Sequence, residues 1–210
     1  MNKSDFNSVW SVLHGGAEIK GVVKTWLAIS YASAKVLSAL RISPNFLTLL
    51  GLIFAIAMAV DPLSLWTIPL LVLSLYADGI DGSVAIYQNR SSAFGAILDS
   101  VADRMSEALW FYVAYRIGAP AWLVLVTYVI ASTQEYARAR LGGLGISDVG
   151  VVTPAERPVR ASFIFIALVA YAFGLNLVLA VMAVLFILQL WSFYLVARFA
   201  HNRLRNDFSA

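Results

Sequence analysis

The sequence contains no cysteine among its 210 residues and carries little charge. The absence of cysteine excludes a disulfide framework and any metal site built on thiolates. Only 13% of the residues are charged, whereas about a quarter is usual in a soluble domain, so the chain has few groups with which to cover a water-exposed surface. The net charge of +3 is small for a nucleic-acid-binding protein. We therefore expect no nucleic-acid partner.

Apolar residues, by contrast, make up 60% of the sequence and raise its mean hydropathy to +0.79. Uncharged stretches recur at residues 43–60, 62–77, 117–134 and 161–197. The last stretch is too long for one span of about 20 residues, and Gly174-Leu175-Asn176 near its middle is a natural turn. Together with the mostly apolar segment 93–115, these stretches predict an all-α integral membrane protein with six transmembrane helices, because helices satisfy their own backbone in lipid.

The first 42 residues differ from the rest, because basic residues recur among the apolar ones between Lys20 and Arg41. A basic helix with one apolar side is typical of a segment that lies in the lipid headgroup layer, and a soluble helix packed on the domain is the alternative. We predict an N-terminal region with an amphipathic juxtamembrane helix (residues 1–42), a six-helix transmembrane domain (43–200) and a tail (201–210).

Basic residues are distributed unequally between the two sides that six spans would create. Nearly all Lys and Arg fall on the side that holds both chain ends, whereas Arg116 falls on the other side and Arg104 within a span. Basic residues collect on the cytoplasmic side of membrane proteins. We therefore predict a multi-pass protein of the cytoplasmic membrane with both termini in the cytoplasm.

Four aspartates lie in otherwise apolar segments. Asp78 and Asp81 are three residues apart near the end of the second predicted span, and Asp99 and Asp103 are four apart near the start of the third. Both spacings place side chains on one helix face, and the short loop makes the two helices neighbours. Such a cluster needs a counter-charge, and hard divalent cations prefer carboxylate oxygen. We therefore predict a metal site, with two ions as is usual in phosphoryl chemistry. Glu107, one turn beyond Asp103, is expected to pair with a basic residue.

A polytopic cation transporter is an alternative interpretation of these acidic residues. It predicts acids near the middle of the bilayer, often on broken or repeated helices. Here the acids lie at one end of their spans, and Gly79, Gly82 and Gly95 leave room for a bulky ligand against the backbone. This pattern favours an enzyme.

The block from Asp78 to Asp103 resembles the signature of the CDP-alcohol phosphotransferases, membrane enzymes of phospholipid synthesis. The family pattern D-x2-D-G-x2-A-R-x8-G-x3-D-x3-D is matched with every spacing intact at Asp78, Asp81, Gly82, Ala85, Gly95, Asp99 and Asp103. Residues 43–48 also resemble the family's entry to its first span. The one departure is Ile86, which replaces an arginine that would contact the donor's diphosphate, and Arg90 is a possible substitute. A catalytically altered family member is therefore a second alternative.

The resemblance implies transfer of a phosphatidyl group from a CDP-alcohol, such as CDP-diacylglycerol, to a small polar alcohol, with release of CMP. It implies that Mg²⁺ or Mn²⁺ is held by Asp78, Asp81, Asp99 and Asp103, with Asp103 also the general base, at a cytoplasmic active site. It assigns the CDP part of the donor to Asn45, Thr48, Gly82, Ala85, Arg90, Ser92 and Gly95. A homodimer is usual in the family.

Four arginines flank the fourth and fifth predicted spans, namely Arg138, Arg140, Arg157 and Arg160. Guanidinium groups suit bidentate recognition of phosphate, so we predict that they bind a phosphorylated acceptor, and ordinary flanking charge is the alternative. The arrangement is similar to that of bacterial phosphatidylinositol phosphate and phosphatidylglycerol phosphate synthases. The former typically add an arginine in the sixth span, which is absent between residues 161 and 197, so the identity of the acceptor stays open.

Overall fold

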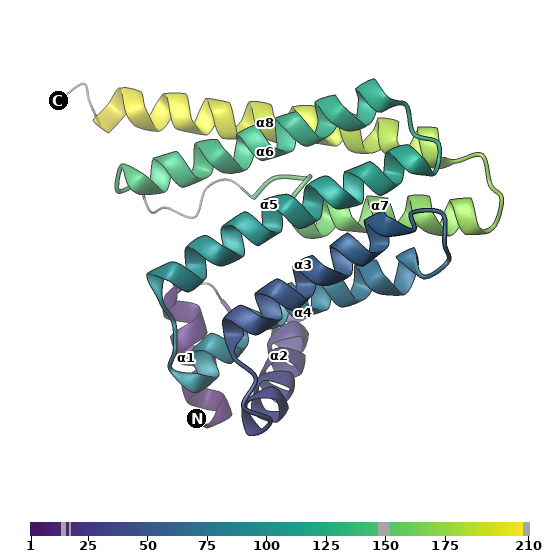
Figure 1. Ribbon diagram of the computed structural model, residues 1–210. Helices are drawn as coiled ribbons and strands as arrows, with labels where there is room; N and C mark the ends of the chain where they lie inside the picture. Colours follow the sequence, from purple (N-terminus) through teal and green to yellow (C-terminus); the bar gives the residue numbers. More distant parts are fainter. Residues whose placement is uncertain (14–15, 17, 147–151, 208–210) are drawn as a thin grey trace. The chain divides into compact units, whose positions relative to one another are not determined.

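A computed structural model describes residues 1–13, 16, 18–146 and 152–207 of the chain (Figure 1). The described residues form helices and no strand, so the prediction of an all-helical protein is confirmed. The helices are α1 (Lys3–Leu13), α2 (Gly21–Ala39), α3 (Pro44–Val60), α4 (Thr67–Gln88), α5 (Ala93–Arg116), α6 (Ala121–Gly143), α7 (Arg157–Ala172) and α8 (Val178–Asp207).

Each helix from α3 to α8 overlaps one of the six stretches predicted as spans, although α4, α6 and α8 extend well beyond the uncharged residues. The chain leaves α7 and enters α8 across Gly174, whose φ of +68° is a left-handed conformation that glycine adopts without strain. Two helices, α4 and α8, are individually long and apolar enough to cross a membrane, and α2 and α3 form a further span if this pair, bent by 108°, counts as one. The described residues therefore include helices that are able to span a membrane, whereas the six-span topology and the interfacial position of α2 remain predictions.

Contacts within the chain define two compact units. The first unit comprises Met1–Ala57 and Pro69–Ser106, and the second comprises Met58–Ile68 and Glu107–Ala210. All four predicted metal-binding aspartates fall in the first unit, and all four arginines of the predicted acceptor site fall in the second. The domain boundaries after residues 42 and 200 remain predictions.

In the first unit, α3 and α4 approach each other closely at Gly51. The hydroxyl of Ser74 donates a hydrogen bond of 2.8 Å to the carbonyl oxygen of Gly51, and a Cβ at Gly51 would lie only 3.1 Å from the Ser74 carbonyl oxygen. Small residues allow this kind of contact between helix backbones. Leu47, Ile80 and Val84 are buried together beyond this crossing, with Ala34 of α2. This packing places the start of α3 against the part of α4 that carries the aspartates.

In the second unit, α8 packs against both α6 and α7 (Figure 1). Polar side chains are buried inside this three-helix packing. Gln189 of α8 donates a hydrogen bond of 2.8 Å to the side-chain oxygen of Gln134 on α6, and the hydroxyl of Ser192 accepts one of 2.9 Å from the backbone N–H of Ala155. Buried polar groups need such partners, and each bond therefore fixes how the helices align.

Candidate active site

The short connection between α4 and α5 is fixed by local hydrogen bonds. Gln88 at the end of α4 donates to the carbonyl oxygen of Ile42 at 2.7 Å, which attaches this end of α4 to the segment before α3. Ser92 precedes α5, and its hydroxyl accepts a hydrogen bond of 3.0 Å from the backbone N–H of Gly95. The hydroxyl of a serine in this position accepts a hydrogen bond from an N–H group of the first turn, which has no partner within the helix. Ser92 therefore favours a helix start at this point of the motif.

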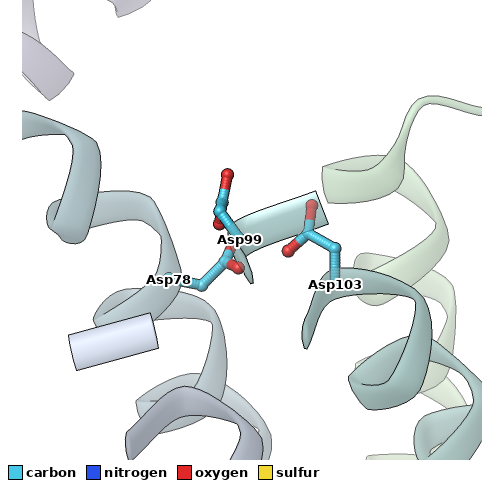
Figure 2. Close-up of side chains that lie close together, drawn as sticks. All are labelled: Asp78, Asp99 and Asp103. Carbon is cyan, nitrogen blue, oxygen red and sulfur yellow. The ribbon is translucent and has the colours of Figure 1, made fainter. Parts of the chain in front are cut away.

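Three aspartates from α4 and α5 converge in the first unit. Asp78, Asp99 and Asp103 each offer one carboxylate oxygen, and these oxygens all lie within 4.8 Å of one another. Figure 2 shows Asp78 and Asp103 extending toward Asp99 from two sides. All three side chains are half-buried, so the carboxylates are partly shielded from water without being sealed from a ligand. This set of oxygen donors fits a hard divalent cation such as Mg²⁺ or Mn²⁺.

The fourth aspartate is placed differently. Asp81 is only 6% exposed, and its carboxylate accepts hydrogen bonds from the hydroxyl of Thr48 and from the backbone N–H of Gly82. It lies close enough to Asp99 and Asp78 for the negative charges to interact, although it does not belong to the group of three. Asp81 therefore connects α4 to α3 through Thr48, and its role as a metal ligand remains a prediction.

A pocket of about 400 Å³ adjoins this cluster. Asp78, Asp81 and Asp99 contribute to its wall. Every residue that the sequence assigned to donor binding also lines it, namely Asn45, Thr48, Gly82, Ala85, Arg90, Ser92 and Gly95. The motif therefore brings the predicted metal ligands and the predicted donor-binding residues to one cavity, whereas their roles are still predictions.

Several residues of this pocket were missed by the sequence analysis. Trp10 and Leu13 of α1 and Trp26 of α2 line it together with the predicted residues and with Ile86, the departure from the family pattern. Nothing in the local sequence around the tryptophans distinguishes them from residues that face lipid. Only the packing of α1 and α2 against α4 brings them to the pocket.

The four predicted acceptor arginines have different environments in the second unit. Arg160 is fully buried and donates to the carboxylate of Glu107, to the carbonyl oxygen of Ala155 at 2.6 Å and to Glu135 at 3.3 Å. The expected pairing of Glu107 with a basic residue is thus confirmed. Arg140 is exposed, and the guanidinium of Arg157 lies 4.9 Å from the centre of the Trp110 ring.

Arg138 forms a two-pronged ion pair with Glu156, whose oxygens accept hydrogen bonds of 2.8 and 2.7 Å. The backbone N–H and the hydroxyl of Thr153 also donate to Glu156, each at 2.8 Å. Burial by itself would raise the pKa of Glu156, but the bonds from Arg138 and Thr153 outweigh it and lower the pKa to about 2. Hydrogen bonding to Glu156 likewise raises the pKa of Arg138. The pair remains ionised throughout the physiological range.

This pairing predicts how stability depends on pH. Because the pKa of Glu156 falls from 4.5 to about 2 on folding, its stabilising contribution is complete above pH 4.5 and is lost as the pH falls toward 2. We expect Glu156→Gln to lower the free energy of unfolding by about 1–3 kcal/mol at pH 7 and to lose less stability than the wild type between pH 5 and 3. Thermal unfolding in detergent at several pH values measures both effects, and parallel pH profiles of the two proteins would contradict the assignment.

Comparison with known proteins places these features in a family. The family model described as CDP-alcohol phosphatidyltransferase matches residues 41–198, about three quarters of the chain. A phosphatidylinositol phosphate synthase of Corynebacterium glutamicum is 35% identical over 140 residues, which cover 60% of this chain and 63% of that protein. An archaetidylinositol phosphate synthase of Pyrococcus horikoshii is 31% identical over 139 residues, which cover 63% of this chain and 72% of that protein. The match therefore spans less than two thirds of the first of these relatives.

A solved structure has the same fold. The crystal structure of the phosphatidylinositol phosphate synthase of Mycobacterium tuberculosis, with CDP-DAG bound, superposes with a TM-score of 0.64 and 22% sequence identity. The superposition covers 83% of this chain and 92% of that one. At this level of identity the likeness concerns the arrangement of the helices.

Proposed function

The chain belongs to the CDP-alcohol phosphatidyltransferase family, and from this premise we propose that it transfers a phosphatidyl group from a CDP-alcohol to the hydroxyl of a small polar alcohol, releasing CMP. CDP-diacylglycerol is the donor we favour. The observation that carries the proposal is the convergence of Asp78, Asp99 and Asp103 beside the pocket lined by the motif residues. Family membership gives no support to the alternative of a cation transporter.

The metal would be held by Asp78, Asp99 and Asp103, with Asp81 as a further predicted ligand. Two divalent cations, when bound, would neutralise the diphosphate of the donor and the charge that develops on the departing CMP. Mg²⁺ is the ion that we propose, with Mn²⁺ as a substitute. The carboxylates themselves fix where that positive charge lies, and Asn45 and Ser92 supply polar groups for the nucleotide.

In the proposed reaction, the acceptor oxygen bonds to the β-phosphorus of the donor while the bond from that phosphorus to the oxygen bridging the two phosphates breaks. The bridging oxygen leaves with CMP, and the proton of the acceptor hydroxyl passes to the carboxylate of Asp103. A carboxylate can serve as such a base when it lies within hydrogen-bond reach of the hydroxyl. Positioning of the two substrates supplies much of the rate enhancement in a reaction of this kind.

A phosphorylated polyol is the acceptor class that we propose. The curated relatives include synthases of phosphatidylinositol phosphate and of archaetidylinositol phosphate, and the exposed side chain of Arg140 is accessible to an anionic acceptor. Inositol phosphate itself is one member of the class. Because no arginine lies between residues 161 and 197, glycerol phosphate and other polyol phosphates are also candidate acceptors.

The decisive experiment uses the purified protein with CDP-diacylglycerol, Mg²⁺ and a panel of acceptors that contains polyol phosphates, free polyols and serine. We expect release of CMP that requires both the acceptor and the metal, and that disappears on chelation and returns with Mg²⁺. Absence of CMP release with every acceptor would refute the proposal. Release at the same rate without any acceptor would indicate a hydrolase instead.

Arg157→Ala tests the acceptor site. We expect it to raise the acceptor's KM about ten- to a hundredfold, the cost of one charge-assisted hydrogen bond, and to leave the donor's KM unchanged. Arg198→Ala is the matched control, because Arg198 is an exposed arginine on the same predicted side. Equal weakening of donor and acceptor in Arg157→Ala would instead place this arginine at the diphosphate. If neither KM changes, Arg157 contributes only to the flanking positive charge that orients the protein in the membrane.

The proposed setting is the cytoplasmic membrane, with both termini and the pocket on the cytoplasmic side and with a homodimer as the assembly. The support for this orientation is the distribution of basic residues in the sequence. Because the chain lacks cysteine, single cysteines can be introduced and labelled one at a time. Leu175→Cys, between α7 and α8, should react with a membrane-impermeant reagent in intact cells, whereas Asn89→Cys, between α4 and α5, should react only after permeabilisation.

A further inference from the structure

The N-terminal helices contribute to the pocket although they precede the region that the family model matches. The family match begins at residue 41, whereas Trp10 and Leu13 come from α1 and Trp26 from α2. These side chains line the same cavity as Asp78 and Asp99. Part of the pocket wall is thus built from residues that the family signature does not specify.

Packing at Ile86 holds α1 in this place. Phe6 is fully buried and packs with Leu27 of α2 and with Ile86, the residue that replaces the signature arginine. The ring of Tyr31 lies 5.5 Å from that of Phe6 and 5.8 Å from that of Tyr87, measured between ring centres. An arginine at position 86 would put a charge into this apolar contact, which is costly without a partner. Isoleucine in place of the signature arginine therefore provides an apolar surface against which α1 packs.

The indole ring of Trp26 lies directly against the backbone of α4. A Cβ added to Gly79 would be 2.9 Å from Cζ2 of Trp26, closer than two carbon atoms approach without displacement. Gly82, three residues onward in the same helix, has open space where its Cβ would point. Trp26 is 39% exposed, so part of its ring surface is accessible to a ligand. A flat, uncharged surface thus lies beside free space in a pocket that also contains carboxylates.

A CDP-alcohol offers two chemically different parts to such a pocket. Its diphosphate needs positive charge, which the metal would supply at the aspartates. Its base is flat and aromatic, and bases stack on indole rings without requiring hydrogen bonds to their edges. We infer that Trp26, together with Trp10, forms the surface on which the cytosine base of the donor stacks, and that the contact of Phe6 with Ile86 holds α1 in position for it. This inference rests on the proposed function.

The test measures nucleotide binding to the full-length protein in detergent by titration calorimetry, with Mg²⁺ present. CMP is the probe for base and phosphate together, and pyrophosphate is the probe for the phosphate part alone. We expect Trp26→Leu to raise the Kd for CMP about 5- to 100-fold and to leave the Kd for pyrophosphate unchanged. Trp26→Phe, which keeps an aromatic face, should recover most of the affinity.

Two further variants separate stacking from general damage to the protein. Trp66→Leu is the matched control, because Trp66 is 73% exposed and lies outside the pocket, and it should bind both probes as the wild type does. Phe6→Ala keeps both tryptophan side chains in the protein but removes the residue that holds α1 in position. It should weaken binding of CMP without changing binding of pyrophosphate.

The possible outcomes distinguish this inference from the proposed function. Wild-type protein that releases CMP from CDP-diacylglycerol, combined with Trp26→Leu protein that binds CMP with unchanged affinity, would refute the stacking and leave the function intact. An equal loss of CMP and pyrophosphate binding in Trp26→Leu would make the ring a structural support of the pocket. A loss seen only with CDP-diacylglycerol would place the ring against the lipid. Wild-type protein without CMP binding or release would refute the function and the inference together.

Discussion

Replacement of Asp99 by asparagine is expected to lower the rate of CMP release by about 100-fold or more. Asp99 lies within the group whose carboxylate oxygens are within 4.8 Å of one another, so the change removes a negative ligand from the centre of the predicted metal site. The metal would neutralise negative charge that develops in the transition state. Weaker binding of the metal should therefore lower kcat more than it weakens substrate binding.

The Asp99→Asn protein should nevertheless fold. Asp99 is close enough to Asp81 for charge repulsion, and the substitution removes one of the repelling groups. Thermal unfolding should therefore show no loss of stability, while calorimetric titration with Mn²⁺ should show weakened metal binding. Asp61→Asn, an exposed aspartate outside the cluster, is the matched control. Full activity of Asp99→Asn at ordinary Mg²⁺ concentrations would contradict the metal assignment.

Replacement of Arg160 by methionine is expected to destabilise the protein by about 3–5 kcal/mol, because it leaves Glu107 buried without its counter-charge. Both side chains of this ion pair are completely buried. Arg160 also donates to the carbonyl oxygen of Ala155, so the loss affects the segment before α7 as well. The measurement is the shift of the thermal unfolding midpoint in detergent relative to the wild type.

The double variant Arg160→Met with Glu107→Leu identifies the cause. Replacing both members of a buried pair by apolar residues removes the unpaired charge, so much of the lost stability should return. Arg198→Met is the control for loss of an exposed arginine and should unfold as the wild type does. If Arg160 bound the acceptor, as the sequence analysis predicts, Arg160→Met would keep its stability and lose acceptor affinity alone. The fully enclosed guanidinium favours the structural outcome.

The site could be predicted from the sequence to the extent that helix periodicity determines it. Asp99 and Asp103 are one turn apart on α5, and the short connection brings them to Asp78 on α4, so the spacing is sufficient to predict that these three carboxylates converge. The same spacing does not reveal that Asp81 bonds to Thr48, because rotation of one side chain toward another helix depends on packing. Periodicity places a residue on a face, and its partner is determined by the helix opposite.

The remaining features depend on contacts between residues far apart in the chain. The contact of Trp26 with Gly79 and the ion pair of Arg160 with Glu107 both depend on tertiary packing. Neither contact corresponds to a local pattern in the sequence. The four arginines look alike in sequence, since each lies beside an apolar stretch. They differ in burial and in the groups around them, from the enclosed Arg160 to the exposed Arg140. Composition therefore predicts that a segment forms an apolar helix, but it does not predict which groups the charged side chains of that helix pair with.

The buried pair of Glu107 and Arg160 also has a consequence for biogenesis. The two residues are 53 positions apart, so at a synthesis rate of about 5–20 residues per second α5 emerges from the ribosome roughly 3–10 seconds before its arginine partner. During that interval Glu107 has no counter-charge from α7. We therefore expect the earlier helices to stay beside the insertion machinery until α7 arrives. On the predicted six-span topology we expect α5 and α7 to enter the lipid together, and a nascent chain truncated before residue 160 to remain associated with the translocon.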